Sequence, residues 1–170
     1  MQAYIAVCEQ KGYVKPSYYQ GQYNAICRNH EKDLIPLLRQ HQMSYIAYSP
    51  IAGGFLSGIY TQGTQVAGTR FEEGNSAGAF YKRMYDKPVM HEAMRKLQEC
   101  CNSHGLSLVE AALRWLCYHS ALGSADGVIL GASKEEQVKH NMEAISKGPL
   151  VEAVSSLFEK TWKEVETEAP

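Results

Sequence analysis

Residues 43–58 read MSYIAYSPIAGGFLSG, a strand-like run that passes directly into a proline and a series of glycines. Aromatic and β-branched side chains predict a strand over 43–49. The glycines of the stretch that follows, SPIAGGFLSG (49–58), have two interpretations. They either relieve strain in a tight turn or allow the backbone to approach a ligand closely. The remainder of the chain decides between these two interpretations.

Helical and strand-like segments alternate on both sides of this run. Two further strands are predicted, one in KPSYYQ (15–20) and one in DGVILG (126–131). Residues 59–87 have weak periodicity and are predicted to form a long loop. Helices are predicted over the ranges 2–11, 29–41 and 88–104, and after Ser107, Ser133 and Gly148. Because strands alternate with helices, the sequence predicts an α/β fold with about three parallel strands and helices outside the sheet.

The composition describes one globular domain. The 170 residues are 45% apolar and carry a net charge of −1, without a run of Lys and Arg, so neither nucleic acid nor an anionic membrane is expected as a partner. Apolar stretches long enough to span a bilayer are absent from the sequence, and its start does not resemble a signal peptide.

The cysteines predict reduced thiols and a cytoplasmic location. The five cysteines are scattered and form no C-x-x-C pair. The segment CCNSH (100–104) offers only three potential metal ligands at poor spacing, so no metal site is predicted.

Two loops follow predicted parallel strands, at the edge of the sheet where ligands bind in α/β folds. The first is SPIAGGFLSG (49–58), whose backbone N–H groups could face an anion such as a pyrophosphate. The second is GASKEEQ (131–137), where a capping box of Ser133 and Glu136 begins a helix and Lys134 adds a cation. Taken alone, the second loop is better explained by helix capping than by binding, and the glycine-rich first loop is ambiguous between turn geometry and binding. Together, they match the usual phosphate position of a (β/α)8 barrel and favour a binding function.

Four ordered motifs now identify a resemblance. They are YYQGQYN (18–24), YSPIAGGFLSG (48–58), AALRW (111–115) and VILGASKEEQVKHN (128–141). In this order they resemble the aldo-keto reductase superfamily, with the aflatoxin-aldehyde reductase group as the most similar branch. The resemblance covers nearly the whole chain and implies the C-terminal portion of a (β/α)8 TIM barrel, which is incomplete in this chain. It also implies an NADP(H)-dependent oxidoreductase that reduces aldehydes or ketones by hydride transfer.

The resemblance assigns roles to individual residues. Gln20 matches the glutamine that bonds the nicotinamide carboxamide, and Tyr48 matches the aromatic residue that stacks on the nicotinamide ring. The pyrophosphate loop corresponds to Ser49, Pro50, Ile51, Ala52, Gly53, Leu56 and Gly58. The segment for the adenosine and its 2′-phosphate corresponds to Gly131, Ala132, Ser133, Lys134, Gln137 and Asn141. In FYKRMYD (80–86), Tyr81 and Arg83 are expected to contact the substrate, although the family's arginine aligns closer to Met84.

The resemblance also implies that the catalytic groups lie elsewhere. The family uses an aspartate, a tyrosine, a lysine and a histidine, all from strands and loops that would precede Met1, so no catalytic residue is assigned. The chain is therefore expected to be inactive alone, and either to self-associate or to require a complementary N-terminal half. The alternatives are a non-catalytic nucleotide-responsive or interaction module, and a truncated gene product.

Overall fold

The computed structural model describes residues 1–60, 67, 69, 71–72 and 74–170. The helices are α1 (Gln2–Lys11), α2 (Leu34–Gln40), α3 (Ser76–Tyr85), α4 (Pro88–Ser103), α5 (Leu108–Tyr118), α6 (Glu135–Ser146) and α7 (Glu152–Val165), and two 3-10 helices are η1 (Asn29–Glu31) and η2 (Ala52–Ser57). The strands are β1 (Tyr18–Gln22), β2 (Ser44–Tyr48) and β3 (Gly127–Val128).

The three strands form one parallel sheet in the order β1-β2-β3. Tyr18 pairs with Ser44 at the start of the first ladder, and Ile46 pairs with Gly127 in the second. This arrangement confirms the predicted portion of a (β/α)8 barrel. Within the described residues, β1 and β3 each have a neighbour on one side only, so both edges of the sheet are open.

The sheet has one covered face and one open face. In β2 the side chains of Tyr45 and Ala47 are fully buried, whereas Ile46 and Tyr48 are half-buried, because successive side chains of a strand point to opposite faces. Gln20 is level with Ile46 in the parallel ladder and therefore faces the open side. In a complete barrel, one face of the sheet lines the interior.

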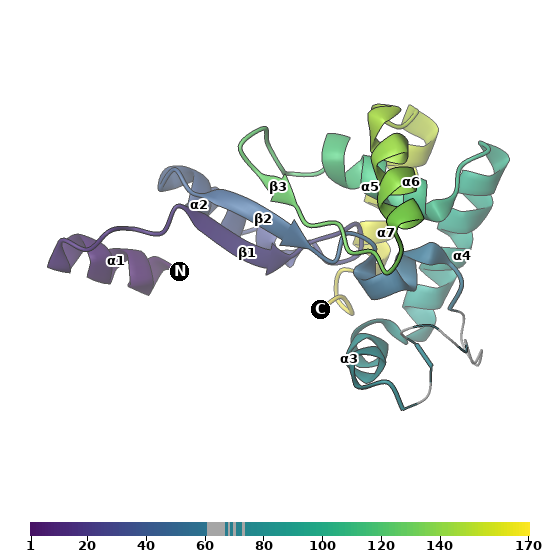
Figure 1. The fold of residues 1–170 in the computed structure, drawn as a ribbon, viewed down its shortest axis with the longest axis horizontal. Helices are drawn as coiled ribbons and strands as arrows, with labels where there is room; N and C mark the ends of the chain where they lie inside the picture. The colour runs from purple at the N-terminus through teal and green to yellow at the C-terminus, as the bar shows by residue number, and fades with distance from the viewer. Residues whose placement is uncertain (61–66, 68, 70, 73) are drawn as a thin grey trace.

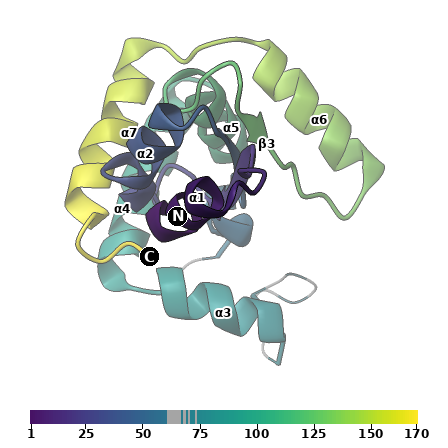
Figure 2. The same ribbon diagram turned by 90° about the vertical axis from the view of Figure 1, so that its left-hand side faces the viewer.

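The helices gather at one end of the molecule. Figure 1 shows α4, α5, α6 and α7 grouped together, while α1 lies at the opposite end beyond the strands. The core of the helical group includes Trp115 of α5 stacked on Phe158 of α7, with ring centroids 6.1 Å apart. In Figure 2, α7 lies to the left and α6 to the right of the centre of the molecule, and α3 lies at the bottom.

β3 is only two residues long and is tied to the rest of the sheet by the residue before it. The Asp126 carboxylate, fully buried, accepts hydrogen bonds from the backbone N–H groups of Tyr45 (2.7 Å) and Gly123 (2.7 Å). The guanidinium of Arg39, on α2, donates to both carboxylate oxygens. Asp126 therefore connects α2, β2 and the turn that leads into β3.

Several predicted boundaries are wrong. Residues 59–87 are not a continuous loop, because α3 occupies Ser76–Tyr85; its buried residues Gly78, Tyr81 and Tyr85 repeat at helical spacing. The predicted helix 29–41 is divided into η1 and α2 by a turn, and the strand predicted over 126–131 is confined to Gly127–Val128.

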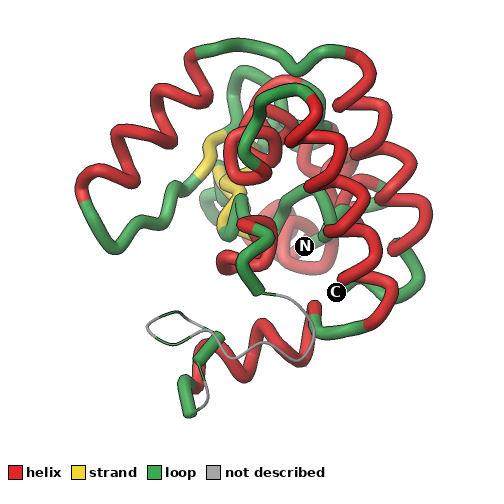
Figure 3. The backbone as a smooth tube through the Cα atoms, turned by 90° about the vertical axis from the view of Figure 1, so that its right-hand side faces the viewer, coloured by secondary structure: helices red, strands yellow, loops and turns green. Residues whose placement is uncertain are grey.

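The helix predicted over 88–104 is confirmed as α4, with Pro88 in its first turn. The Ser107 cap is confirmed as well, because its side chain accepts a hydrogen bond from the N–H of Glu110 (3.1 Å). The tube in Figure 3 shows how the short strands lie among these helices. In the part of the chain that the structure describes, no helix is both long and apolar enough to cross a bilayer.

Candidate functional site

The two glycine-containing loops meet at the carboxyl ends of β2 and β3. Two adjoining hollows, of about 840 Å³ and about 550 Å³, are lined by residues from both loops. Ile51, Gly53, Gly131 and Gln137 line both of these hollows. The predicted site residues that line one or both are Tyr48, Ser49, Pro50, Ile51, Gly53, Gly131, Ala132, Ser133, Gln137 and Asn141. The fold thus brings these predicted residues, which are far apart in the sequence, together around two adjoining hollows.

The first loop has an unusual backbone. Ser49 (φ 54°), Ala52 (φ 51°), Gly53 (φ 67°) and Gly54 (φ 105°) all lie in the left-handed region. For residues other than glycine, this conformation costs about 1–3 kcal/mol and persists only where surrounding contacts impose it. Several N–H groups of the loop close turns within it: Ala52 N–H donates to the carbonyl of Ser49 (2.9 Å), and Gly54 N–H to that of Ile51 (2.9 Å).

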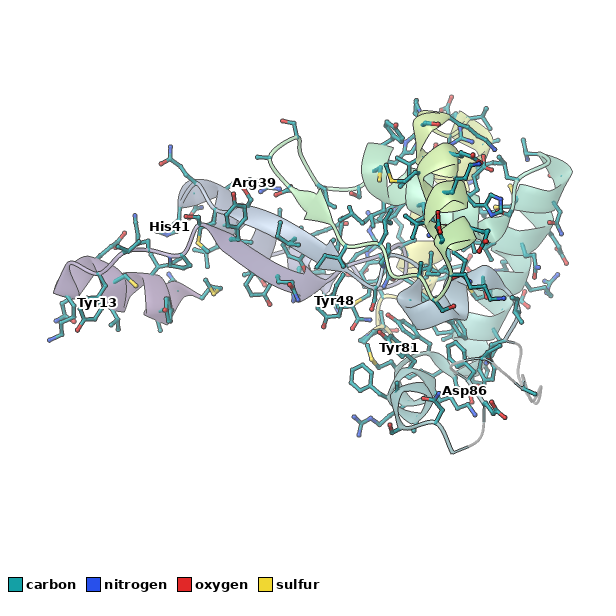
Figure 4. The ribbon with its side chains drawn as sticks, viewed as in Figure 1. Tyr13, Arg39, His41, Tyr48, Tyr81 and Asp86 are labelled. Carbon is teal, nitrogen blue, oxygen red and sulfur yellow. The ribbon has the colours of Figure 1, made fainter. Side chains whose placement is uncertain are left out.

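Packing inside the protein requires glycine at position 53. A Cβ atom there would lie 2.5 Å from the ring of Tyr81, which is far closer than atoms approach in proteins. Tyr81 comes from α3, and its hydroxyl shares a hydrogen bond with that of Ser49 (Oη–Oγ 2.7 Å). Figure 4 shows Tyr48 at the end of β2 and Tyr81 on α3 below it. Turn geometry and internal packing therefore explain Gly53 before any ligand is considered.

A buried polar network lies behind this loop. The Tyr85 hydroxyl accepts hydrogen bonds from the side-chain amides of Gln22 (2.5 Å) and Asn24 (3.3 Å), and the Asn24 amide also donates to the carbonyl of Ser49 (3.0 Å). Burial raises the pKa of the Tyr85 phenol, so the group remains a neutral hydroxyl. Sequence reasoning missed Gln22, Asn24 and Tyr85, although Gln22 and Asn24 lie within the motif YYQGQYN.

The second loop differs from the first in being exposed throughout. Every residue from Gly131 to His140 is exposed. A Cβ atom at Gly131 would meet none of the described residues within 4 Å. Asn141 is half-buried on α6, one turn beyond Gln137.

The predicted capping box of Ser133 and Glu136 is wrong by one residue. Lys134 is the N-cap of α6, and Gln137 is the third residue of the helix. The side-chain oxygen of Gln137 accepts hydrogen bonds from the N–H groups of Ser133 (2.8 Å) and Lys134 (3.3 Å). Among the described residues, no carboxylate forms an ion pair with Lys134, which follows the lining residue Ser133 but lines neither hollow itself.

Other predicted residues, Lys134 and Tyr81 among them, line neither hollow, whereas Tyr48 lines the larger one. Ala52 and Leu56 are fully buried and support the first loop from inside, whereas Gly58 ends η2 with a φ of 72°. Gln20 is exposed on the open face of the sheet, and Arg83 is exposed on α3. Tyr48 is half-buried, and burial, with a smaller contribution from neighbouring Tyr81, raises the pKa of its phenol.

The described part of the chain contains no cluster of three His, Cys, Asp or Glu side chains that could hold a metal ion. Its cysteines are all unpaired, and in the segment 100–104 the side chain of Cys101 is buried. The Cys100 sulfur and the His104 Nδ1 are 4.0 Å apart.

Comparison with known proteins identifies the family. Residues 2–163 match the family model described as aldo/keto reductase family. This chain belongs to the aldo/keto reductase family. It is 37% identical to an aldo-keto reductase of Pseudocercospora fijiensis, over 94% of this chain and 55% of that protein. It is 38% identical to aflatoxin B1 aldehyde reductase member 2 of Homo sapiens, over 96% of this chain and 48% of that protein.

A third relative, oxidoreductase sirO of Leptosphaeria maculans, is 36% identical over 94% of this chain and 49% of that protein. The chain thus spans about half the length of these aldo/keto reductase relatives. The family match agrees with the resemblance that the four motifs carry.

Proposed function

We propose that this chain is the cofactor-binding C-terminal half of an NADP(H)-dependent oxidoreductase that reduces aldehydes or ketones by hydride transfer. One observation carries the proposal: the two loops at the ends of the neighbouring parallel strands β2 and β3 line a common space. Two relatives are named as an aldehyde reductase and an oxidoreductase, in agreement with this proposal.

The cofactor would lie across the carboxyl ends of the strands. Gln20 and Tyr48, both on the open face of the sheet, would hold the nicotinamide, by a hydrogen bond to its carboxamide and by stacking. The loop 49–58 would carry the pyrophosphate, and residues 131–141 the adenosine. When bound, the reduced nicotinamide supplies the hydride. The residues present fit such a cofactor, because the hollow is lined both by apolar side chains, such as Ile51 and Phe71, and by polar ones, such as Gln137 and Asn141.

Selection of NADP(H) over NAD(H) would come from Lys134. Its ammonium group lies at the N-terminus of α6, where a phosphate is also favoured by the helix dipole. Glu135 and Glu136 in the first turn work against an anion, so the lysine is the main source of attraction for a 2′-phosphate. The substrate would approach from the side of α3, where Arg83 is exposed and Tyr81 lies against the loop.

The chain is proposed to lack turnover by itself. A bound cofactor without a positioned proton donor loses the acid step, which commonly contributes about 10²–10⁴ in rate. The two open sheet edges, together with exposed apolar side chains such as Tyr18 and Ile129, suit association with the other half of a barrel or with another copy. The five unpaired cysteines suit a cytoplasmic protein.

The proposal is tested by NADPH oxidation with an aromatic aldehyde. The assay is run on the chain alone and after joining it to the N-terminal half of the human relative named above. We expect no turnover by the chain and measurable turnover by the joined protein. Turnover by the chain alone that Tyr48→Phe abolishes would show that the active site is misplaced. Nucleotide binding without turnover in the joined protein would instead support a non-catalytic nucleotide-responsive module.

A further inference from the structure

Ser49 is the residue where β2 passes into the first loop, and it is held on two sides. Its side-chain hydroxyl is bonded to the hydroxyl of Tyr81 (2.7 Å), and its carbonyl accepts from the amide of Asn24 (3.0 Å). Both contacts depend on α3, because Asn24 is in turn bonded to Tyr85, one helical turn after Tyr81. The two tyrosine rings are nearly parallel, with centroids 6.4 Å apart.

These contacts act on a strained residue. Ser49 has a φ of 54°, which a serine adopts only where its surroundings impose it. Ala52 N–H is bonded to the Ser49 carbonyl (2.9 Å), so the conformation of Ser49 sets the first turn of the loop. The Tyr81 ring also covers the Cα of Gly53. One side chain of α3 therefore contacts the loop at its beginning and at its first left-handed glycine.

We propose that the Tyr81 hydroxyl is a positioning group that holds Ser49 left-handed and so presets the loop 49–54 for the dinucleotide. The inference rests on the proposed function, because the value of a preset loop is the ordering cost that binding then avoids. Tyr81 acts through Ser49 and need not contact the cofactor. A neutral hydrogen bond contributes about 0.5–1.5 kcal/mol, so its loss should weaken binding by about 3- to 10-fold.

If Tyr81 served only to pack the core, its replacement by phenylalanine would leave the loop and the Kd for NADPH unchanged. The ring of Tyr81 is buried and would stabilise the fold in the phenylalanine variant as well. Tyr81→Phe therefore keeps the packing against Gly53 and removes the contact with Ser49. Tyr118→Phe is the matched control, because the Tyr118 hydroxyl donates a hydrogen bond to the carbonyl of Ile145 (2.8 Å), away from the loop.

The experiment combines two measurements on the 170-residue chain. Amide hydrogen exchange is recorded without ligand, and the Kd for NADPH is measured by calorimetry, for the wild type, Tyr81→Phe, Ser49→Ala, the double variant and Tyr118→Phe. We expect Tyr81→Phe to accelerate exchange in residues 51–56 about tenfold and to leave residues 45–47 of β2 unchanged. We also expect a 3- to 10-fold higher Kd, with no further increase when Tyr81→Phe is added to Ser49→Ala.

The possible results distinguish failure of the positioning role of Tyr81 from failure of the proposed cofactor-binding function. Equal acceleration in the loop and in β2, or a loop unchanged by Tyr81→Phe, overturns the positioning role. Faster loop exchange with an unchanged Kd also overturns it, since the loop would not be preset for this ligand. If the wild type binds no NADPH, the proposed cofactor fails, and the exchange data still decide whether Tyr81 fixes the loop.

Discussion

The loop after β2 and the loop after β3 occupy equivalent places in the sheet but are stabilised differently. The first is fixed from within the protein: Phe55 and Leu56 are fully buried, and Tyr81 packs against Gly53. The second is exposed from Gly131 to His140, and its hydrogen bonds are local: the Gln137 side chain accepts from the N–H groups of Ser133 and Lys134, and the Gln137 N–H donates to the Lys134 carbonyl (3.1 Å).

The difference shows that similar glycine patterns arise for different physical reasons. Gly53 is required by a positive φ and by the ring of Tyr81, so its presence says little about a ligand. Gly131 has neither constraint among the described residues. A glycine that the fold does not need is the better indication of close approach by something outside the chain.

The strongest test of this comparison replaces each glycine by alanine. Gly53→Ala should lower the free energy of unfolding by about 2–4 kcal/mol, because a left-handed non-glycine residue and an overpacked ring each add a cost. Gly131→Ala should change it by no more than about 0.5 kcal/mol, yet weaken NADPH binding on the order of tenfold, or about 1.4 kcal/mol. Urea unfolding followed by tryptophan fluorescence, together with calorimetry, measures both.

Two results would contradict this difference between the loops. If Gly131→Ala destabilises the chain as much as Gly53→Ala does, the second loop has internal constraints of its own. If it leaves NADPH binding unchanged, the backbone at Gly131 does not approach the cofactor.

The second prediction concerns the contacts that hold β3, the strand before the exposed second loop, in the sheet. β3 has two residues, so the buried Asp126 carboxylate and its partners Arg39, Tyr45 and Gly123 hold the strand that carries the loop. Asp126→Asn should lower the free energy of unfolding by about 2–3 kcal/mol, since it weakens charge-assisted hydrogen bonds at a buried group. Glu92→Gln, which removes one charge of an exposed pair with Arg95, should leave the free energy of unfolding nearly unchanged.

Lowering the pH should remove the stabilisation that the Asp126 carboxylate provides. Burial alone would raise the pKa of the Asp126 carboxyl, but hydrogen bonds from Arg39, Gly123 and Tyr45 hold it below its ordinary value. The stabilisation is therefore complete above the unfolded-state pKa of about 3.9 and is lost as pH falls through the lower folded-state pKa. In urea titrations at pH values from 7 down to 3, the free energy of unfolding of the wild type should approach that of Asp126→Asn only at the most acidic values. A constant difference across the whole range would contradict this assignment.

A smaller effect is expected at the start of α6. Gln137→Ala removes the acceptor for the N–H groups of Ser133 and Lys134 and should weaken this helix start by about 0.5–1 kcal/mol. Gln137→Glu keeps an acceptor oxygen and should preserve it. Amide exchange at residues 133–136 distinguishes the two variants, and equal protection in both would show that the second loop is held in another way.

Elements of the fold could be predicted where residues next to them in the sequence mark their ends. α4 was found because Pro88 and Gly105 mark its ends, and α5 because Ser107 caps it. α3 was missed, although Tyr81 and Tyr85 are four residues apart, because the helix starts in a glycine-rich region with little apolar periodicity. The strand predicted over 126–131 was too long, because only Gly127 and Val128 pair with β2.

The residues of the candidate site likewise fall into those marked by local sequence and those joined by long-range contacts. The loop residues could be predicted because each loop directly follows its strand. The network of Gln22, Asn24 and Tyr85 could not, because its hydrogen bonds join β1 and its following turn to α3 across about sixty positions of sequence. The cap at Ser133 was displaced to Lys134 because a glutamine three residues later competes with Glu136 for the same role.

The central claim, that this chain holds NADP(H) between the two loops, is tested most directly by titrating NADPH and NADH into the chain joined to an N-terminal half of the family. NADPH should bind about fivefold more tightly, an effect of about 1 kcal/mol expected for one exposed charge contact. Lys134→Ala should remove this preference without changing the Kd for NADH, whereas Lys139→Ala, an exposed lysine later in the same helix, should preserve it. Equal affinities for the two cofactors in the wild type, or a preference that survives Lys134→Ala, would contradict the account.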